Sequence, residues 1–244
     1  MSRRRRVREA AQHGTFAALL IAFLPAAAPA VLAQSTDTLI EVTTAAGAFA
    51  QGLYNSAIRD NVFIDINSVR STVLEDSLQG THGIVQINQD SGFGSNQANM
   101  VIISVAANAT NPVAMASFHG HVEISGNNVT IANVTRSNVI QNILAGSAGI
   151  AQINQNSGNL NTNINAIAVA IGLGQGNAVL ALGDGSLSVA KTNNQFTVNG
   201  PVQQSNVISG VANFTGIAQI SQTNGEGNVV ANTMTISVNV MNIQ

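Results

Sequence analysis

The sequence predicts an all-β protein, a three-repeat β-solenoid in which strand-turn-strand units stack as cross-β layers. Three observations support this fold class: one motif recurs at a nearly fixed spacing, the repeated segments alternate with a period of two, and only 8% of the residues are charged. The motif begins as "GIVQINQDSG" at Gly83, "GIAQINQNSG" at Gly149 and "GIAQISQTNG" at Gly216. Self-similarity at a fixed period is typical of solenoids.

The first segment, residues 1–33, is predicted to be a secretory signal peptide. Five arginines precede the apolar run "FAALLIAFL", and "VLA" supplies small residues before a cleavage site that follows Ala33. An uncleaved membrane anchor is the alternative, and the arginine run leaves the Tat route open. We therefore expect a secreted bacterial protein, extracellular or on the cell surface, with no membrane span after cleavage.

The charge of the remaining chain excludes two classes of partner. Four cations and ten acidic residues follow the predicted cleavage site, which gives a net charge of −6. Binding to nucleic acid or to an anionic membrane surface needs clustered Lys and Arg, so neither is expected. The chain has no cysteine. An exported protein of this kind has to be held together without disulfides.

The remaining chain is predicted to consist of three strong repeats joined by less similar connectors. The segments are an N-terminal segment 34–70, repeat 1 at 71–105, connector 1 at 106–136, repeat 2 at 137–171, connector 2 at 172–204, and repeat 3 with the C-terminus at 205–244. Related stretches recur in the connectors, because "NPVAMA" at Asn111 and "NAVLAL" at Asn177 are separated by the same interval as the first two motif copies. The connectors are thus predicted to be weaker β-forming parts of a longer module.

The first arm of each repeat carries amides on both faces of a predicted strand. In "IAQINQ" (150–155) aliphatic and amide residues are arranged so that each face has both kinds. If the copies stack in register, each amide can hydrogen-bond to its equivalents above and below, whereas a charge would repel its own image. The predicted ladder residues are Gln86, Asn88, Gln89, Asn99, Gln152, Asn154, Gln155, Asn165, Gln219, Gln222 and Asn232.

The turn and the second arm complete each unit. Every second residue of 101–105, 167–171 and 234–238 is bulky and apolar, which predicts a strand whose bulky side is buried. Glycine and asparagine are expected where the turns need positive φ. The predicted turn glycines are Gly83, Gly92, Gly149, Gly158, Gly216 and Gly225.

Each repeat thus carries a glycine, then Asn or Ser followed by Gln, then a second glycine and an asparagine-rich turn. The residues are Gly83, Asn88, Gln89, Gly92, Asn96, Gln97 and Asn99; Gly149, Asn154, Gln155, Gly158, Asn161, Asn163 and Asn165; and Gly216, Ser221, Gln222, Gly225, Asn228 and Asn232. This pattern resembles the Fap functional-amyloid fibrillins, secreted bacterial proteins whose three imperfect repeats assemble into biofilm fibres. Curli subunits are similar through "QDSGFGSNQAN", although their repeats are shorter and contiguous. The cysteine pair of some Fap subunits is missing, which leaves the major and minor fibre components as alternatives.

No pattern predicts a cofactor or a metal site. His119, His121 and Glu123 are spaced at i, i+2 and i+4, so they lie on one side of a strand and could ligate a metal. They occur once and have no fourth ligand in view. A solvated strand face is the expected structure.

We predict a non-enzymatic structural subunit that self-assembles into amyloid-like fibres of the biofilm matrix or cell surface. Its partner is then another copy of itself, with helper proteins for export and nucleation. The alternative is a soluble β-solenoid adhesin or surface-layer binding protein. A more distant alternative is a polysaccharide-acting β-helix enzyme that uses Glu75, Asp76 and Asp90 as its carboxylates.

Overall fold

A computed structural model of the chain describes residues 33–43, 47–109, 111–174 and 180–241, which form sixteen β-strands and no helix. The predicted signal peptide lies outside the described residues, apart from Ala33. No helix long and apolar enough to cross a membrane occurs in the described part of the chain. All strand pairs are parallel, so the predicted all-β solenoid is confirmed.

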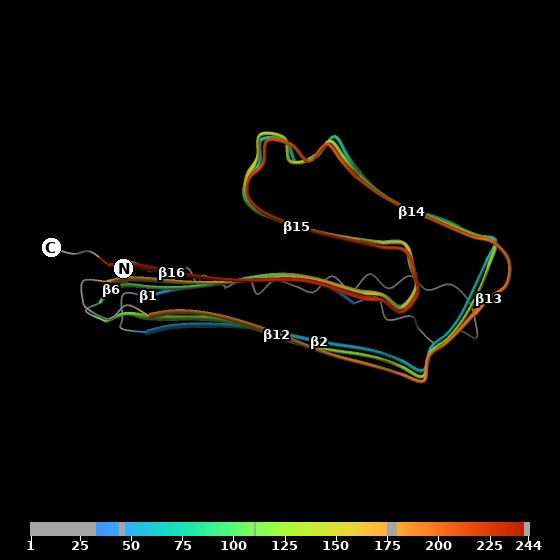
Figure 1. Ribbon diagram of the computed structural model, residues 1–244, viewed down its shortest axis with the longest axis horizontal. Coiled ribbons are helices and arrows are strands. Elements are labelled where there is room, and N and C mark those ends of the chain that lie inside the picture. The colour runs from blue at the N-terminus through green and yellow to red at the C-terminus, as the bar shows by residue number, and fades with distance from the viewer. Residues whose placement is uncertain (1–32, 44–46, 110, 175–179, 242–244) are drawn as a thin grey trace, which may run out of the picture.

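Five strands make one rung of the solenoid, and three rungs stack directly on one another (Figure 1). Rung 1 consists of β2 (Gly47–Arg59), β3 (Val62–Ile66), β4 (Val69–Glu75), β5 (His82–Asp90) and β6 (Asn96–Ala109). Rung 2 consists of β7 (Val113–Ser125), β8 (Asn128–Ala132), β9 (Val134–Gln141), β10 (Ala148–Asn156) and β11 (Thr162–Gly174). Rung 3 consists of β12 (Leu180–Thr192), β13 (Gln195–Val198), β14 (Val202–Ser209), β15 (Thr215–Thr223) and β16 (Val229–Met241).

Equivalent strands of the three rungs lie side by side and form five parallel sheets along the stack. In the β5-β10-β15 sheet, Gly149 lies opposite Gly83 on one side and Gly216 on the other. The interval between motif copies in the sequence is therefore the length of one turn of the solenoid. The sheet that contains β6 has a fourth strand, because β1 (Ala33–Thr43) pairs with the outer edge of β6.

The rung is folded into layers of unequal extent. On the right of Figure 1 the strands β12, β16, β15 and β14 follow one another from bottom to top, whereas on the left only the β12 and β16 layers overlap. Two apolar cores fill the space between layers. The larger core lies between the sheets of β7 and β11, and the smaller one between the sheets of β9 and β10.

The larger core corrects the predicted buried face of the second arm. In β11 the small residues Ala168 and Ala170 are buried, whereas the bulky Val169 and Ile171 that alternate with them are only half-buried. The reason lies in the facing sheet, which contributes large side chains such as Phe118 to the core. Small residues on β11 let the two sheets approach at native packing density.

The smaller core explains why both faces of the first arm carry amides. Ala151 and Ile153 of β10 pack against Ile140, Ile143 and Leu144. The opposite face of β10 lies against the β6-β11-β16 sheet. Because β10 lies between two sheets, neither face is exposed to water, and the polar residues on each face need partners inside the protein.

The corners between strands use residues that tolerate left-handed backbone. At the corner that follows β2, β7 and β12, the residues Asp60, Gly126 and Asn193 have φ of 54°, 66° and 55°. Asp, Asn and Gly adopt this conformation at lower cost than other residues. The same corner therefore recurs in every rung and keeps the strands in register.

Candidate functional site

A column of glutamines joins the three rungs on the inner face of β5, β10 and β15. Gln86 donates from Nε2 to Oε1 of Gln152 at 2.9 Å, and Gln152 donates from Nε2 to Oε1 of Gln219 at 2.8 Å. Gln152 also donates to the carbonyl of Met100 at 3.0 Å, which ties the column to the next sheet. Gln152 is fully buried. Both polar atoms of the Gln152 side chain therefore have partners within the protein.

A second glutamine column lies on the opposite face and donates in the opposite direction. Gln155 donates from Nε2 to Oε1 of Gln89 at 2.7 Å, and Gln222 donates from Nε2 to Oε1 of Gln155 at 2.8 Å. Each of these amides also donates to a backbone carbonyl of the β4-β9-β14 sheet, as Gln155 does to Val139 at 3.1 Å. The two columns hold the β10 sheet to both of its neighbours.

A double column of asparagines lies between β5 and β6 and their equivalents. Asn165 donates to Oδ1 of Asn99 at 3.0 Å, and Asn232 donates to Oδ1 of Asn165 at 2.9 Å. Asn154 donates to Oδ1 of Asn88 at 3.1 Å and lies beside Asn165, which donates to it at 2.9 Å. The structure thus brings the predicted ladder amides together in columns along the stack.

The first set of turn glycines sits where consecutive rungs are in close contact. Gly83, Gly149 and Gly216 have φ of 108°, 130° and 134°. A Cβ atom on Gly149 would lie 2.0 Å from the carbonyl oxygen of Gly83, and one on Gly216 would lie 2.0 Å from that of Gly149. Only glycine fits between the rungs at this position.

The second set of turn glycines is needed because consecutive rungs approach closely there, and not because the backbone has a positive φ. Gly92, Gly158 and Gly225 do not have positive φ, contrary to the expectation for these positions. A Cβ atom on Gly92 would lie 1.7 Å from the carbonyl oxygen of Gly158, and one on Gly158 would lie 1.9 Å from that of Gly225. The left-handed residue of this turn comes two positions later, at Leu160 in rung 2.

A buried charge cluster lies beside the turns, and sequence reasoning missed it. Arg136 donates to Oδ2 of Asp65 at 2.9 Å and also pairs with Glu226. Arg70 is stacked on Arg136 in register, pairs with Asp65 at 3.0 Å and donates to Asn159 at 2.6 Å. The two arginines face two carboxylates, so the cluster is neutral. Arg70 and Arg136 are separated in sequence by one turn of the solenoid, and this spacing could have predicted that they stack on each other.

The carboxylates near this cluster have shifted pKa values. Burial pushes the pKa of Asp65 up, but hydrogen bonds from Ser68 and Arg136 outweigh it and hold that pKa below its usual value. Burial raises the pKa of Glu226 despite the Arg136 guanidinium beside it. Burial also raises the pKa of Asp90 to about 6, against hydrogen bonds from the Gly92 amide and Asn156.

A further asparagine column at the corner after β2, β7 and β12 was also missed. Asn61 donates from Nδ2 to Oδ1 of Asn127 at 2.9 Å, and Asn127 donates to Oδ1 of Asn194 at 2.8 Å. Asn127 donates as well to the carbonyl of Ile58 at 2.9 Å. The signal was the asparagine that recurs at the centre of the equivalent triplets "DNV" (60–62), "GNN" (126–128) and "NNQ" (193–195).

The residues considered for metal binding lie on the outer side of β7. His119 Nδ1 lies 2.7 Å from the hydroxyl of Ser186 in the next rung, and Glu123 pairs with Arg59 in the previous one. His121 is exposed. Within the described ranges no three His, Cys, Asp or Glu side chains gather in a way that could hold a metal ion.

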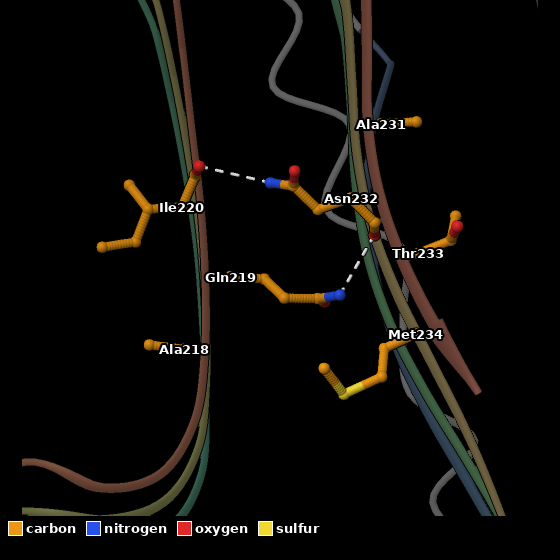
Figure 2. Close-up of a pocket in the computed structure, with 7 residues that line it drawn as sticks. All are labelled: Ala218, Gln219, Ile220, Ala231, Asn232, Thr233 and Met234. Carbon is orange, nitrogen blue, oxygen red and sulfur yellow. Dashed lines mark hydrogen bonds between the residues drawn. The ribbon is translucent and has the colours of Figure 1, made fainter. Parts of the chain in front are cut away.

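The amide columns reach the surface at the ends of the stack. At the rung 3 end, β15 and β16 border an open groove of about 490 Å³, lined by Ala218, Gln219, Ile220, Ala231, Asn232, Thr233 and Met234. Figure 2 shows Gln219 pointing from β15 toward β16 and Asn232 pointing back. Gln219 donates to the Asn232 carbonyl at 3.2 Å, and Asn232 donates to the Ile220 carbonyl at 3.2 Å. This end of the stack is the candidate site.

Comparison with known proteins agrees with this architecture. The model of the functional amyloid protein FapB/FapC family matches residues 50–239, a range that runs from β2 into β16 and includes parts of all three rungs. No curated protein and no solved structure matches the chain at a significant level. The matched family consists of structural amyloid proteins and not of enzymes. Because the match covers well over half of the sequence, the chain belongs to the FapB/FapC family of functional amyloid proteins.

Proposed function

We propose that the chain is a secreted structural subunit that self-assembles into amyloid-like fibres of the biofilm matrix or cell surface. Assembly proceeds by stacking, so that rung 1 of one copy lies on rung 3 of the copy below it. One observation carries the proposal: the upper edges of β12 to β16 and the lower edges of β2 to β5 are the same parallel edges that pair between rungs within the chain, and the amide columns reach the upper end.

The strand edges support this mode of assembly. Among the described strands, none pairs with the upper edges of β12 to β16 or with the lower edges of β2 to β5. Unpaired edges are templates for another strand, and solenoids that stay monomeric need capping repeats. In the described ranges, no helix covers either end.

The register within the chain defines the register between copies. Each residue of β10 pairs with its equivalent one rung earlier in β5 and one rung later in β15. The same rule between copies puts Gly216 of the lower copy beside Gly83 of the upper one, and Gln222 beside Gln89. Gln222 uses Nε2 for both of its hydrogen bonds within the chain, so its Oε1 is placed to accept from the next copy.

Burial in the terminal rungs supports the same conclusion. Ile153 of rung 2 is fully buried, whereas its equivalents Ile87 and Ile220 are half-buried. A copy stacked on each end would bury Ile87 and Ile220 as fully as Ile153. Removal of apolar surface from water favours this association by roughly 25 cal/mol per Å².

Secretion and location are part of the proposal. The predicted signal peptide and membership of a functional amyloid family both support an extracellular or cell-surface fibre, with helper proteins for export and nucleation. The first test is direct: the purified mature chain should form SDS-resistant fibres with a cross-β reflection near about 4.7 Å. A chain that stays monomeric over days at high micromolar concentration would instead fit the adhesin alternative.

The sharper test is Gly225→Ala, which alters the upper end of the stack alone. Within the chain, a Cβ atom on Gly225 would contact only the movable side chain of Asn228, with Nδ2 at 2.6 Å. In a stack it would meet the Gly92 carbonyl of the next copy, as a Cβ on Gly158 meets Gly225 at 1.9 Å. We expect the variant to fold, with a midpoint of urea unfolding close to that of the wild type, and to form no fibres.

The matched control is Gly185→Ala, in the same rung. A Cβ atom there lies in ordinary contact, 3.4 Å from Cγ2 of Thr235. This control should assemble as the wild type does. Wild-type fibre growth by folded Gly225→Ala would rule out in-register stacking of rung 1 on rung 3.

A further inference from the structure

The strand β1 occupies a position one level below rung 1. It pairs in parallel with β6 along its whole length, from Ala33 opposite Asn96 to Thr43 opposite Ala106. The sheet order is β1-β6-β11-β16. β1 therefore occupies the position that β16 of another copy would take if that copy were stacked below rung 1. The other four sheets of the described chain have no strand at this level.

This position coincides with the one that stacking requires. Thr162 of β11 lies opposite Asn96 of β6 on one side and opposite Val229 of β16 on the other. A second copy stacked below in the same register therefore places its Val229 opposite Asn96, where Ala33 of β1 lies now. The two strands cannot pair with the same edge at once.

We propose that β1 is a displaceable edge cap: it holds the edge of β6 that β16 of a second copy takes in the fibre. The inference rests on the proposed function, because it concerns the same stacking interface. Displacement of β1 is then a step that every incoming copy has to complete, and it sets the delay before growth.

The balance of strand pairing favours the exchange. β1 covers one of the five sheets at the lower end, whereas a complete rung 3 offers a partner strand to all five. In this sheet alone, β16 pairs with β11 from Val229 to Met241, a longer ladder than the one from Ala33 to Thr43 that β1 forms on β6. The cap therefore delays stacking without preventing it.

The acidic residues of β1 agree with the role of a cap. The backbone register places Asp37 opposite Met100 and Glu41 opposite Ser104, and both partners are buried. In rung 2 the corresponding positions are alanines. Carboxylates on an edge strand are a known device against further edge pairing. β1 thus carries charge at register positions that the rungs keep neutral.

The test is a reversible covalent lock of β1 onto β6. Ile40 and Ile103 are register partners, and the chain has no cysteine of its own. Neighbouring strands lie about 4.8 Å apart, which is within the Cα separation that a disulfide spans. We expect the oxidised Ile40→Cys/Ile103→Cys protein to show a lag at least about tenfold longer than the reduced protein, because the open state is no longer populated.

The matched control locks two strands that stay paired in the fibre. Val169 and Ile236 are register partners in β11 and β16, so oxidised Val169→Cys/Ile236→Cys should assemble with an unchanged lag. Deletion of residues 34–43 should shorten the lag of an otherwise native chain. Failure of positions 40 and 103 to cross-link would contradict the pairing on which the cap depends.

The two proposals fail in distinguishable ways. If the wild-type chain forms no fibres, stacking itself is wrong. If the wild type forms fibres but the oxidised lock assembles as fast as the reduced protein, β1 is not a cap and stacking stands. A lag that the deletion leaves unchanged or lengthens would also overturn the cap.

Discussion

The stacked amides of rung 2 act as donor and acceptor at once, which is what allows them to be buried. Gln152 accepts from Gln86 and donates to Gln219, so its two polar atoms are satisfied by identical residues in the adjacent rungs. A buried amide with partners costs little, whereas a buried charge costs several kcal/mol. A lysine at position 152 would therefore disrupt rung 2 itself as well as fibre growth.

Asp90 is a buried carboxylate with one oxygen that lacks a hydrogen-bond partner, and it is a residue through which pH should act. Its Oδ1 accepts from the Gly92 amide at 2.7 Å and from Asn156 at 2.8 Å, while its buried Oδ2 has no partner in the described chain. Burial raises the pKa of Asp90 from 3.8 to about 6. The folded state therefore holds its proton more tightly than the unfolded state, and stability falls as pH rises from about 4 through about 6.

We predict that Asp90→Asn stabilises the protein at neutral pH and not in acid. The substitution places in rung 1 the residue that already stands at position 156 of rung 2. Urea unfolding at pH 7 should show a gain on the order of 1–3 kcal/mol, and unfolding at pH 3.5 should show almost none. An equal gain at both pH values would mean that the Asp90 charge is not the cause. Glu226, whose pKa is also raised by burial, should contribute a pH dependence of the same sign.

At the scale of elements, the strands β3, β4 and β9 are joined to the turn of rung 3 by the arginine pair. Arg136 is 1% exposed and contacts Asp65 from one rung and Glu226 from another, so it bridges all three rungs. Arg70 lies above the ring of Phe93, which stacks on Phe63. This cluster is the described chain's main departure from a purely neutral stack.

We predict that Arg136→Gln lowers the free energy of unfolding by about 3 kcal/mol, because it leaves Glu226 charged and unpaired in a buried site. Glutamine fits this position in principle, since Gln204 occupies it in rung 3. The control is the double variant Arg136→Gln/Glu226→Gln, which removes both charges and should recover part of the loss in urea unfolding. Additive losses in the double variant would show that the pair is not coupled.

At the scale of the whole molecule, the stack has two different ends and therefore a direction. The lower end carries β1, and at the upper end no described strand covers any of the five sheets. A fibre built by stacking inherits this polarity. Its upper end offers rung 3 to the next copy, and its lower end offers a capped rung 1.

The polarity predicts that Gly225→Ala protein terminates fibres at the upper end. Its rung 1 is unaltered and binds to an exposed wild-type rung 3, but its own rung 3 then blocks the next copy. In growth seeded with wild-type fibres, a small fraction of the variant should slow elongation out of proportion to its concentration, because it blocks the upper ends. Gly185→Ala at the same ratio should have no effect. Slowing that only matches dilution of the wild-type chain would contradict polar stacking.

Part of this architecture was predictable because contacts between rungs have a nearly constant offset in sequence. Gly83, Gly149 and Gly216 are neighbours in one sheet, and their regular spacing is visible in the sequence. The β-solenoid fold was predicted from this period, whereas the functional amyloid family was suggested by a resemblance in the residues of each repeat and is shown by the family match. The same offset separates Arg70 from Arg136, although a charged pair at this spacing was not expected to lie inside the stack.

The sequence by itself therefore determined the period of the solenoid and its need for neutral amides and glycines between rungs, because each residue stacks on its own equivalent. Only the tertiary structure decided which faces are buried and which distant residues meet. Arg136 contacts Asp65 and Glu226, whose offsets in sequence differ from the repeat period, and Ala168 is buried beneath large side chains of another sheet. Those offsets depend on how the corners, which recur in every rung, fold the strands into layers, because this layering brings together residues that are not equivalents in the repeat.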